Sequence, residues 1–146
     1  MGDRCNIVVC ARDVEGKNLG QALEEGQAVV FYGHWAGSDM PVRLHAGLVR
    51  GKGRWGDDAY LGRIIFCNFC QSVADLSETT GYGIIAGGLG DNERPILLVD
   101  VPRQKVVRYG TGYVSPNTAG ALEPAQEWSF EEFIELDEGD LERIVG

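Results

Sequence analysis

Residues 31–48 of this 146-residue chain, FYGHWAGSDMPVRLHAGL, contain its strongest candidate binding site. Aromatic and histidine side chains end a strand-like run, a Gly-Ser turn follows, and Pro41 marks the first turn of a helix. A helix N-terminus presents unpaired N–H groups and the positive end of the helix dipole, so it favours a negative charge. The pattern therefore predicts a site for a small anion at this turn.

Several side chains near this turn have the chemistry that such a site needs. Tyr32 or Trp35 would stack on a flat ring, His34 would hydrogen-bond to it, and Arg43 would bind a phosphate or carboxylate. The alternative is structural: Trp35 fills the core, His34 satisfies a buried carbonyl, and the arginines are solvated. The full set of candidate ligand-binding residues is Tyr32, His34, Trp35, Ser38, Arg43, Arg50, Arg54, Arg63, Thr80 and Tyr82.

The outlying members of this set come from three other places in the sequence. Arg50 lies seven residues after Arg43 and projects from the same helix face. Residues 51–60, GKGRWGDDAY, form a glycine-rich junction that is either a mobile basic loop over an anion or, as the pattern favours, a turn between helices. Arg54 and Arg63 stay candidates there. Thr80 and Tyr82 stand at a strand entrance, where turn chemistry explains them equally well.

The four cysteines raise the question of a metal. Cys67 and Cys70 have the C-x-x-C spacing, and with Cys5 and Cys10 they would make a four-thiolate zinc site. A regular strand, however, sends residues 5 and 10 to opposite faces. We therefore expect buried, unreactive thiols, no disulfide, no metal and no cofactor. With two histidines and no Ser-His-Asp order or carboxylate pair, we also expect no catalytic residue.

The net charge of −9 is unevenly distributed. Residues 123–142 contain nine carboxylates and no Lys or Arg, whereas residues 41–63 contain five cations and two carboxylates. An acidic protein with one basic band is a poor general nucleic-acid binder but can hold one small anion. The sequence lacks an apolar run of about 20 residues and a signal pattern, so we expect no membrane partner and a cytoplasmic location.

The hydrophobic pattern predicts an α+β fold, with a mostly antiparallel sheet, two packed helices and a short C-terminal helix. Strands are expected at 6–11, 27–35, 81–88, 95–101 and 105–109, and residues 90–95 as a hairpin loop. One helix begins near Ser38 or Asp39, and a second, buried nearly all round, runs from Asp57 to about Val73. A helical turn is expected from Asn18.

The chain divides into an α+β core domain at 1–109, a loop at 110–127, and an acidic helical tail of the same domain at 128–146. Residues 129–132 form a capping box, and Trp128, Phe130, Phe133 and Ile134 make one apolar face of the tail helix. Because so short a helix is marginal alone, it must dock on this domain or on a second copy. We expect a homo-oligomer, most simply a symmetric dimer, and docking on a second copy would exchange the tails of the two chains.

The start MGDR, the segment YGHWAGSDMP, the run RWGDDAYLGRIIF and the segment TTGYGI together resemble a family of small proteins found in phages, prophages and bacteria. The match covers most of residues 1–109. Cys5 stands where the family pattern has alanine, which puts any role for Cys5 in doubt. The resemblance implies no established activity, but it favours a phage accessory protein, such as one that counters host defence in the host cytoplasm.

Three hypotheses about function follow. The first is a non-catalytic protein that sequesters a small anionic ligand, such as a nucleotide signal. The second is an interaction protein that uses its acidic tail to block a basic partner. The third is a hydrolase similar to the N-terminal-nucleophile class, which needs Cys, Ser or Thr at an exposed N-terminus, whereas this chain has Gly2 after Met1.

Overall fold

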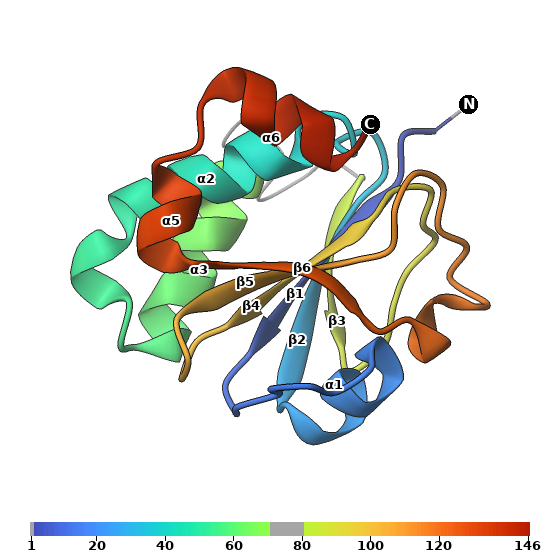
Figure 1. Ribbon diagram of the computed structural model, residues 1–146, viewed down its shortest axis with the longest axis horizontal. Helices are drawn as coiled ribbons and strands as arrows, with labels where there is room; N and C mark the ends of the chain where they lie inside the picture. The colour runs from blue at the N-terminus through green and yellow to red at the C-terminus, as the bar shows by residue number, and fades with distance from the viewer. Residues whose placement is uncertain (1, 71–80) are drawn as a thin grey trace.

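A computed structural model of the chain describes residues 2–70 and 81–146. In this part of the chain a six-stranded sheet has the order β3-β2-β1-β4-β5-β6 (Figure 1). The strands are β1 (Cys5–Cys10), β2 (Ala28–Gly33), β3 (Tyr82–Ala86), β4 (Ile96–Asp100), β5 (Lys105–Tyr109) and β6 (Pro124–Ser129). Only β1 and β4, among these described strands, pair in parallel, and the other neighbours are antiparallel. The predicted α+β class with a mostly antiparallel sheet is confirmed.

The described helices lie on both faces of this sheet (Figure 1). They are α1 (Leu19–Glu25), α2 (Met40–Arg50), α3 (Asp58–Phe69), α5 (Phe130–Ile134) and α6 (Glu138–Ile144), with short 3-10 turns η1 (Lys52–Arg54) and η2 (Ala119–Ala121). Helices α2, α3, α5 and α6 contribute to one core cluster, and α1 with the 110–123 segment contributes to the other. We call the two sides the helix face and the loop face. No described helix is long and apolar enough to cross a membrane.

Strand β1 divides the two clusters because alternate side chains of a strand point to opposite faces. All six of its residues are buried. Cys5, Ile7 and Val9 pack on the helix face, whereas Val8 and Cys10 pack on the loop face. Cys5 and Cys10 therefore lie on opposite faces, as their spacing predicts. A continuous apolar run of this kind is typical of a strand covered on both sides.

The predicted helix starts are confirmed. The side chains of Asn18 and Asp57 accept backbone N–H groups at the first turns of α1 and α3, and α2 follows Asp39 with Pro41 in its first turn. Helix α3 ends at Phe69, and the predicted continuation toward Val73 lies outside the described residues.

The prediction that α3 is buried nearly all round is wrong. One side of α3 packs against α2 and the sheet, but the other side faces solvent and exposes Arg63 and Cys67. The prediction of buried thiols is therefore wrong for Cys67, although Cys5, Cys10 and Cys70 are buried.

The predicted loop at 110–127 is too long, because residues 124–129 form β6. Trp128 pairs with Val106 in this strand and is not part of the tail helix. A proline is tolerated as the first residue of an edge strand, which is why Pro124 does not prevent pairing. The capping box at Ser129 is confirmed, but the helix it starts ends at Ile134, and α6 follows from a second cap at Asp137.

The C-terminal tail docks on its own domain. Phe130 and Phe133 are almost fully buried, and their rings lie 5.2 Å from Trp55 and 5.4 Å from Trp128. Of the two docking surfaces that the sequence left open, the structure has the tail on its own domain. A tail on its own domain gives no support for a dimer. The dimer therefore stays a prediction, which light scattering of the full chain would test.

Residues 90–95 are not the predicted hairpin loop. They connect β3 at one sheet edge to β4, which lies beyond β2 and β1. The buried side chain of Asn6 fixes this crossover through its bonds to Asn92 Oδ1 and the Asp91 carbonyl, both at 3.1 Å. The Asn92 amide, also buried, donates to the Val114 carbonyl at 2.8 Å. The segment thus has a structural role that its turn-like composition concealed.

Candidate functional site

The anion predicted at the turn before α2 is present, but it belongs to the chain itself. The Asp3 carboxylate accepts the backbone N–H of Ser38 at 2.8 Å and its hydroxyl at 2.7 Å. Arg94 Nε also donates to Asp3 at 2.7 Å. Burial raises the pKa of Asp3, but the bonds from Ser38 and Arg94 outweigh it and the net pKa is lowered. Ser38 is therefore a structural residue and not a ligand contact.

Arg43 is also used internally, on the helix face. Its guanidinium donates to the Phe69 carbonyl at 2.7 Å and to the Tyr82 hydroxyl at 2.8 Å, and only 14% of its side chain is exposed. These bonds tie α2 to the end of α3 and to β3. The structure does not bring Arg43 and Tyr82 to His34, because Tyr82 packs on the helix face and Arg43 is bonded to it there.

The other predicted arginines are dispersed. Arg50 hydrogen-bonds Asn68, while Arg54 and Arg63 lie 4.8 and 5.8 Å from the Tyr60 ring. No element brings these three to the turn after Trp35. Thr80 lies outside the described residues.

Tyr32, His34 and Trp35 do come together, as predicted. With Gly81 they line a pocket of about 260 Å³ beyond the end of β2, which we call the His34 pocket. Trp35 is 60% exposed, so it does not fill the core. Its ring lies over Gly81, where a Cβ atom would come within 2.9 Å of Trp35 Cζ3. Glycine at this position, with a φ of +107°, thus leaves room for the exposed indole ring.

The histidine of this pocket has a defined orientation. Its Nδ1 lies 2.7 Å from the Tyr32 hydroxyl and accepts a long bond of 3.5 Å from Arg4 Nε. Because an arginine can only donate, Nδ1 is the acceptor, and the proton of a neutral ring lies on Nε2. Burial raises the pKa of Tyr32, so its hydroxyl stays protonated at neutral pH. His34 Nε2 is thereby left to donate to a ligand.

Arg4 is the functional candidate that the sequence interpretation missed. Its side chain is 36% exposed, and its ion pair with Glu93, at 4.0 Å, is loose. Arg4 does not line the His34 pocket itself but contacts His34 from a neighbouring hollow of about 410 Å³, which it lines with Asn92 and the exposed Tyr113. The start MGDR contained the signal, since a cation directly before a buried strand must lie at the strand's end.

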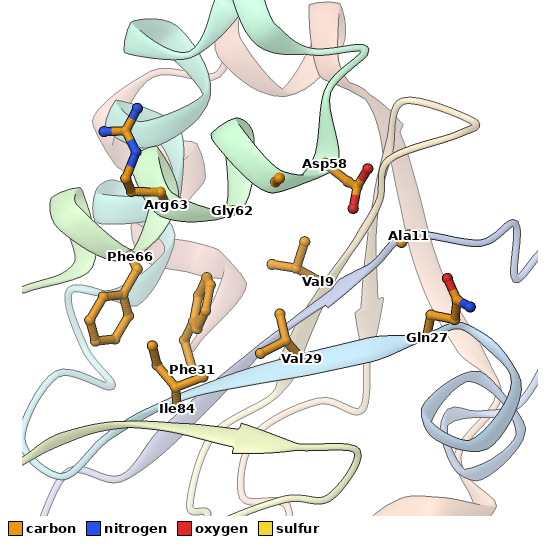
Figure 2. A pocket seen from close by; sticks show the side chains of 11 residues that line it. Val9, Ala11, Gln27, Val29, Phe31, Asp58, Gly62, Arg63, Phe66 and Ile84 are labelled. Atoms are coloured by element: carbon orange, nitrogen blue, oxygen red, sulfur yellow. The ribbon is translucent and has the colours of Figure 1, made fainter.

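A second cavity, of about 420 Å³, lies between α3 and strands β1 to β3 (Figure 2). Val9, Val29, Phe31 and Ile84 line it from the sheet, and Arg63 points away from these apolar side chains. A Cβ atom on Gly62 would meet nothing within 4 Å, so this glycine keeps the cavity open. The lining suits an apolar ligand rather than an anion.

The described residues contain little that supports catalysis. Burial raises the pKa of the fully buried Cys5 thiol, and the Asp3 carboxylate raises it further, so Cys5 is a poor nucleophile. No cluster of three or more His, Cys, Asp or Glu side chains in the described part of the chain could hold a metal ion.

Comparisons with protein-family models, with curated proteins and with solved structures found no match to this chain. The resemblance to phage proteins accordingly stays a prediction.

Proposed function

We propose that this protein binds a small planar ligand carrying a negative charge, of the nucleotide type, and sequesters it without chemical change. The observation that carries the proposal is that the His34 pocket combines an exposed indole with a histidine whose Nδ1 is held from behind by a cation, Arg4, which lines the neighbouring hollow. Trp35 would stack on the ring of the ligand, His34 Nε2 would donate to it, and Arg4 would bind its anionic group.

The biological part of the proposal rests on the sequence. The resemblance to phage proteins is the reason to propose that the ligand is a host-defence signal and that binding removes it from solution. Arg4 takes the role that the sequence interpretation gave to Arg43.

The first experiment identifies the ligand without a guess at its structure. Mass spectrometry of the full chain, purified and then denatured, would detect a retained small molecule. The proposal expects an anionic aromatic compound from the wild type and much less from Arg4→Ala. Equal retention by Arg4→Ala would contradict the assigned site.

The second experiment uses adenosine monophosphate as a probe that combines a flat ring with a phosphate. Calorimetry should give an affinity that Arg4→Ala weakens by roughly ten- to hundredfold, which corresponds to the loss of one charge-assisted bond. The matched control is Arg12→Ala, which removes an exposed arginine outside the pocket. An equal effect of both changes would indicate general charge attraction and not a site.

The acidic surface of the tail supports a second candidate function, which is binding to a basic protein. The carboxylates of residues 123–142 are exposed, except for the partly buried Asp140, while the apolar faces of α5 and α6 are buried. Replacing Glu131, Glu135 and Glu138 by Gln should abolish binding of a lysine-rich peptide at physiological salt. Unchanged binding would remove this candidate.

A further inference from the structure

A pocket of about 300 Å³ lies on the helix face between β5, β6 and α6. It is lined by Arg108, Gln126, Trp128, Leu136, Asp140, Arg143 and Ile144. Strand β6 is at the sheet edge opposite to β3, so this pocket is separate from the His34 pocket at the end of β2. One of its two arginines, Arg108, has a buried donor without an acceptor.

Arg108 is a cation without a partner among the described residues. Its Nε atom is buried and makes no hydrogen bond. No described carboxylate lies within 4 Å of its guanidinium, whereas Arg103, in the turn between β4 and β5, pairs with Asp100 at 2.7 Å and with Glu127 at 3.1 Å. A buried donor without an acceptor is costly, and most buried polar groups in folded proteins are hydrogen-bonded. An unpaired guanidinium at a pocket therefore indicates that its acceptor comes from a ligand.

The neighbouring charges define what the ligand carries. Arg143 pairs with Asp140, and the Asp140 carboxylate also accepts the backbone N–H of Asp137 on the helix cap. That pair is balanced, so Arg108 leaves the pocket with one net positive charge. A dianion would meet the Asp140 carboxylate, whereas a monoanion would match Arg108 alone.

The remaining walls define the rest of the ligand. Trp128, Leu136 and Ile144 supply apolar surface, and Gln126, the cross-strand neighbour of Arg108, supplies an amide. A guanidinium binds the two oxygens of a carboxylate or a phosphodiester in a fork. We infer that this pocket binds an organic monoanion, a carboxylate or a phosphodiester attached to an apolar group, through Arg108. The inference is independent of the proposed function, because the two pockets share no residue.

The binding test uses benzoate, with benzamide as its uncharged counterpart, on the full chain. Saturation-transfer NMR and calorimetry should detect benzoate, but not benzamide, with the wild type. Arg108→Met keeps the length of the side chain and removes its charge, and it should weaken benzoate binding at least tenfold. Arg12→Met, an exposed arginine outside this pocket, should leave the binding unchanged. A dimethyl phosphate titration then shows whether the pocket accepts phosphodiesters as well as carboxylates.

A thermal melt of the unliganded protein separates a binding role from a structural one. If Arg108 is kept for a ligand, Arg108→Met removes a buried Nε donor that has no acceptor, and the variant should melt at the same temperature as the wild type or higher. A structural arginine would give a lower melting temperature. The inference is overturned if the wild type does not bind benzoate, if Arg108→Met binds it equally well, or if that variant melts clearly lower.

Discussion

Polar side chains near the end of β2 have different environments on the two faces of the sheet. On the helix face, Arg43 is largely buried and its bonds to Phe69 and Tyr82 are short. On the loop face, Arg4 is more exposed and has long contacts to His34 and Glu93. Both are arginines near the same strand end, so residue type does not separate structure from function. What separates them is whether the chain itself satisfies their hydrogen bonds.

The hydrogen-bonded group around Asp3 is intermediate between the buried Arg43 and the loosely bonded Arg4. Asp3, Ser38 and Arg94 are partly accessible but saturated by one another. Such a network is a tether rather than a site: it joins the start of the chain to the turn before α2. Arg94 also donates to the Val145 carbonyl at 3.3 Å, so both ends of the chain are held together, as Figure 1 shows.

The largest expected effect concerns the buried tail on the helix face. Phe133→Ala should lower the free energy of unfolding by about 3–5 kcal/mol, because it deletes a fully buried ring. Urea denaturation measures this loss. Ile84→Ala is the control, since Ile84 is 59% exposed and should cost far less. Equal losses would mean that the tail is not docked on this domain.

The two arginines give the next largest difference. Arg43→Met should cost about 2–3 kcal/mol of stability, because it leaves the Phe69 carbonyl and the Tyr82 hydroxyl without their charged donor. Arg4→Met should cost less than about 1 kcal/mol, since its bonds are long and partly exposed. Paired denaturation curves test the comparison directly. A reversed order would make Arg4 the structural residue and remove the proposed site.

Two helical glycines on the helix face differ in the room around them: Gly62 borders the cavity beside α3, whereas Gly47 lies in the tight contact between α2 and α3. Gly62→Ala should stabilise the protein by about 0.5–1 kcal/mol, because the new Cβ meets nothing and the helix gains rigidity. Gly47→Ala should not, because its Cβ would lie 3.0 Å from Ile65 Cα in the contact between α2 and α3. If Gly62→Ala is less stable than the wild type, the new methyl group must meet other atoms, and the space beside α3 is not open in solution.

The smallest expected effect is the pH dependence from Asp3. Although burial raises the pKa of Asp3, the bonds from Ser38 and Arg94 lower it below its ordinary value of about 3.9, so the stabilisation is fully present above that pH and is lost as the pH falls through the lower, folded pKa. Asp3→Asn should therefore be less stable than the wild type at pH 7, and the difference should shrink below about pH 4. Denaturation at both pH values measures it. A constant difference would mean that the Asp3 charge contributes nothing to stability.

The sequence predicted the elements of the fold well where the signal is local. The caps at Asn18, Asp57 and Ser129 and the proline after Asp39 correctly marked helix starts, since a cap depends on residues within one turn. Strand β6 was missed because its Pro124 and polar residues resemble a loop. Only pairing with β5 makes it a strand. The connection at 90–95 was misassigned for a similar reason, because strand order depends on distant partners.

The candidate site was predicted in part. Tyr32, His34 and Trp35 are close in sequence and remain close in the fold, whereas Arg43 and Tyr82 face the other side of the sheet. The place of Arg4 directly before a buried strand could have located it at the strand end, but for both Arg4 and Arg108 nothing in the sequence distinguishes an arginine with unsatisfied bonds from a solvated one.

By itself, the sequence of this protein determined the α+β class, the helix starts, and a positive turn before α2 that requires an anion. Tertiary structure alone decided which anion that is: Ser38 bonds to Asp3, 35 residues away. It likewise decided that Arg43 is structural and that Arg4 lies beside His34. The physical reason is that periodicity and capping act over a few residues, whereas hydrogen-bond satisfaction depends on which distant side chains the fold brings within reach.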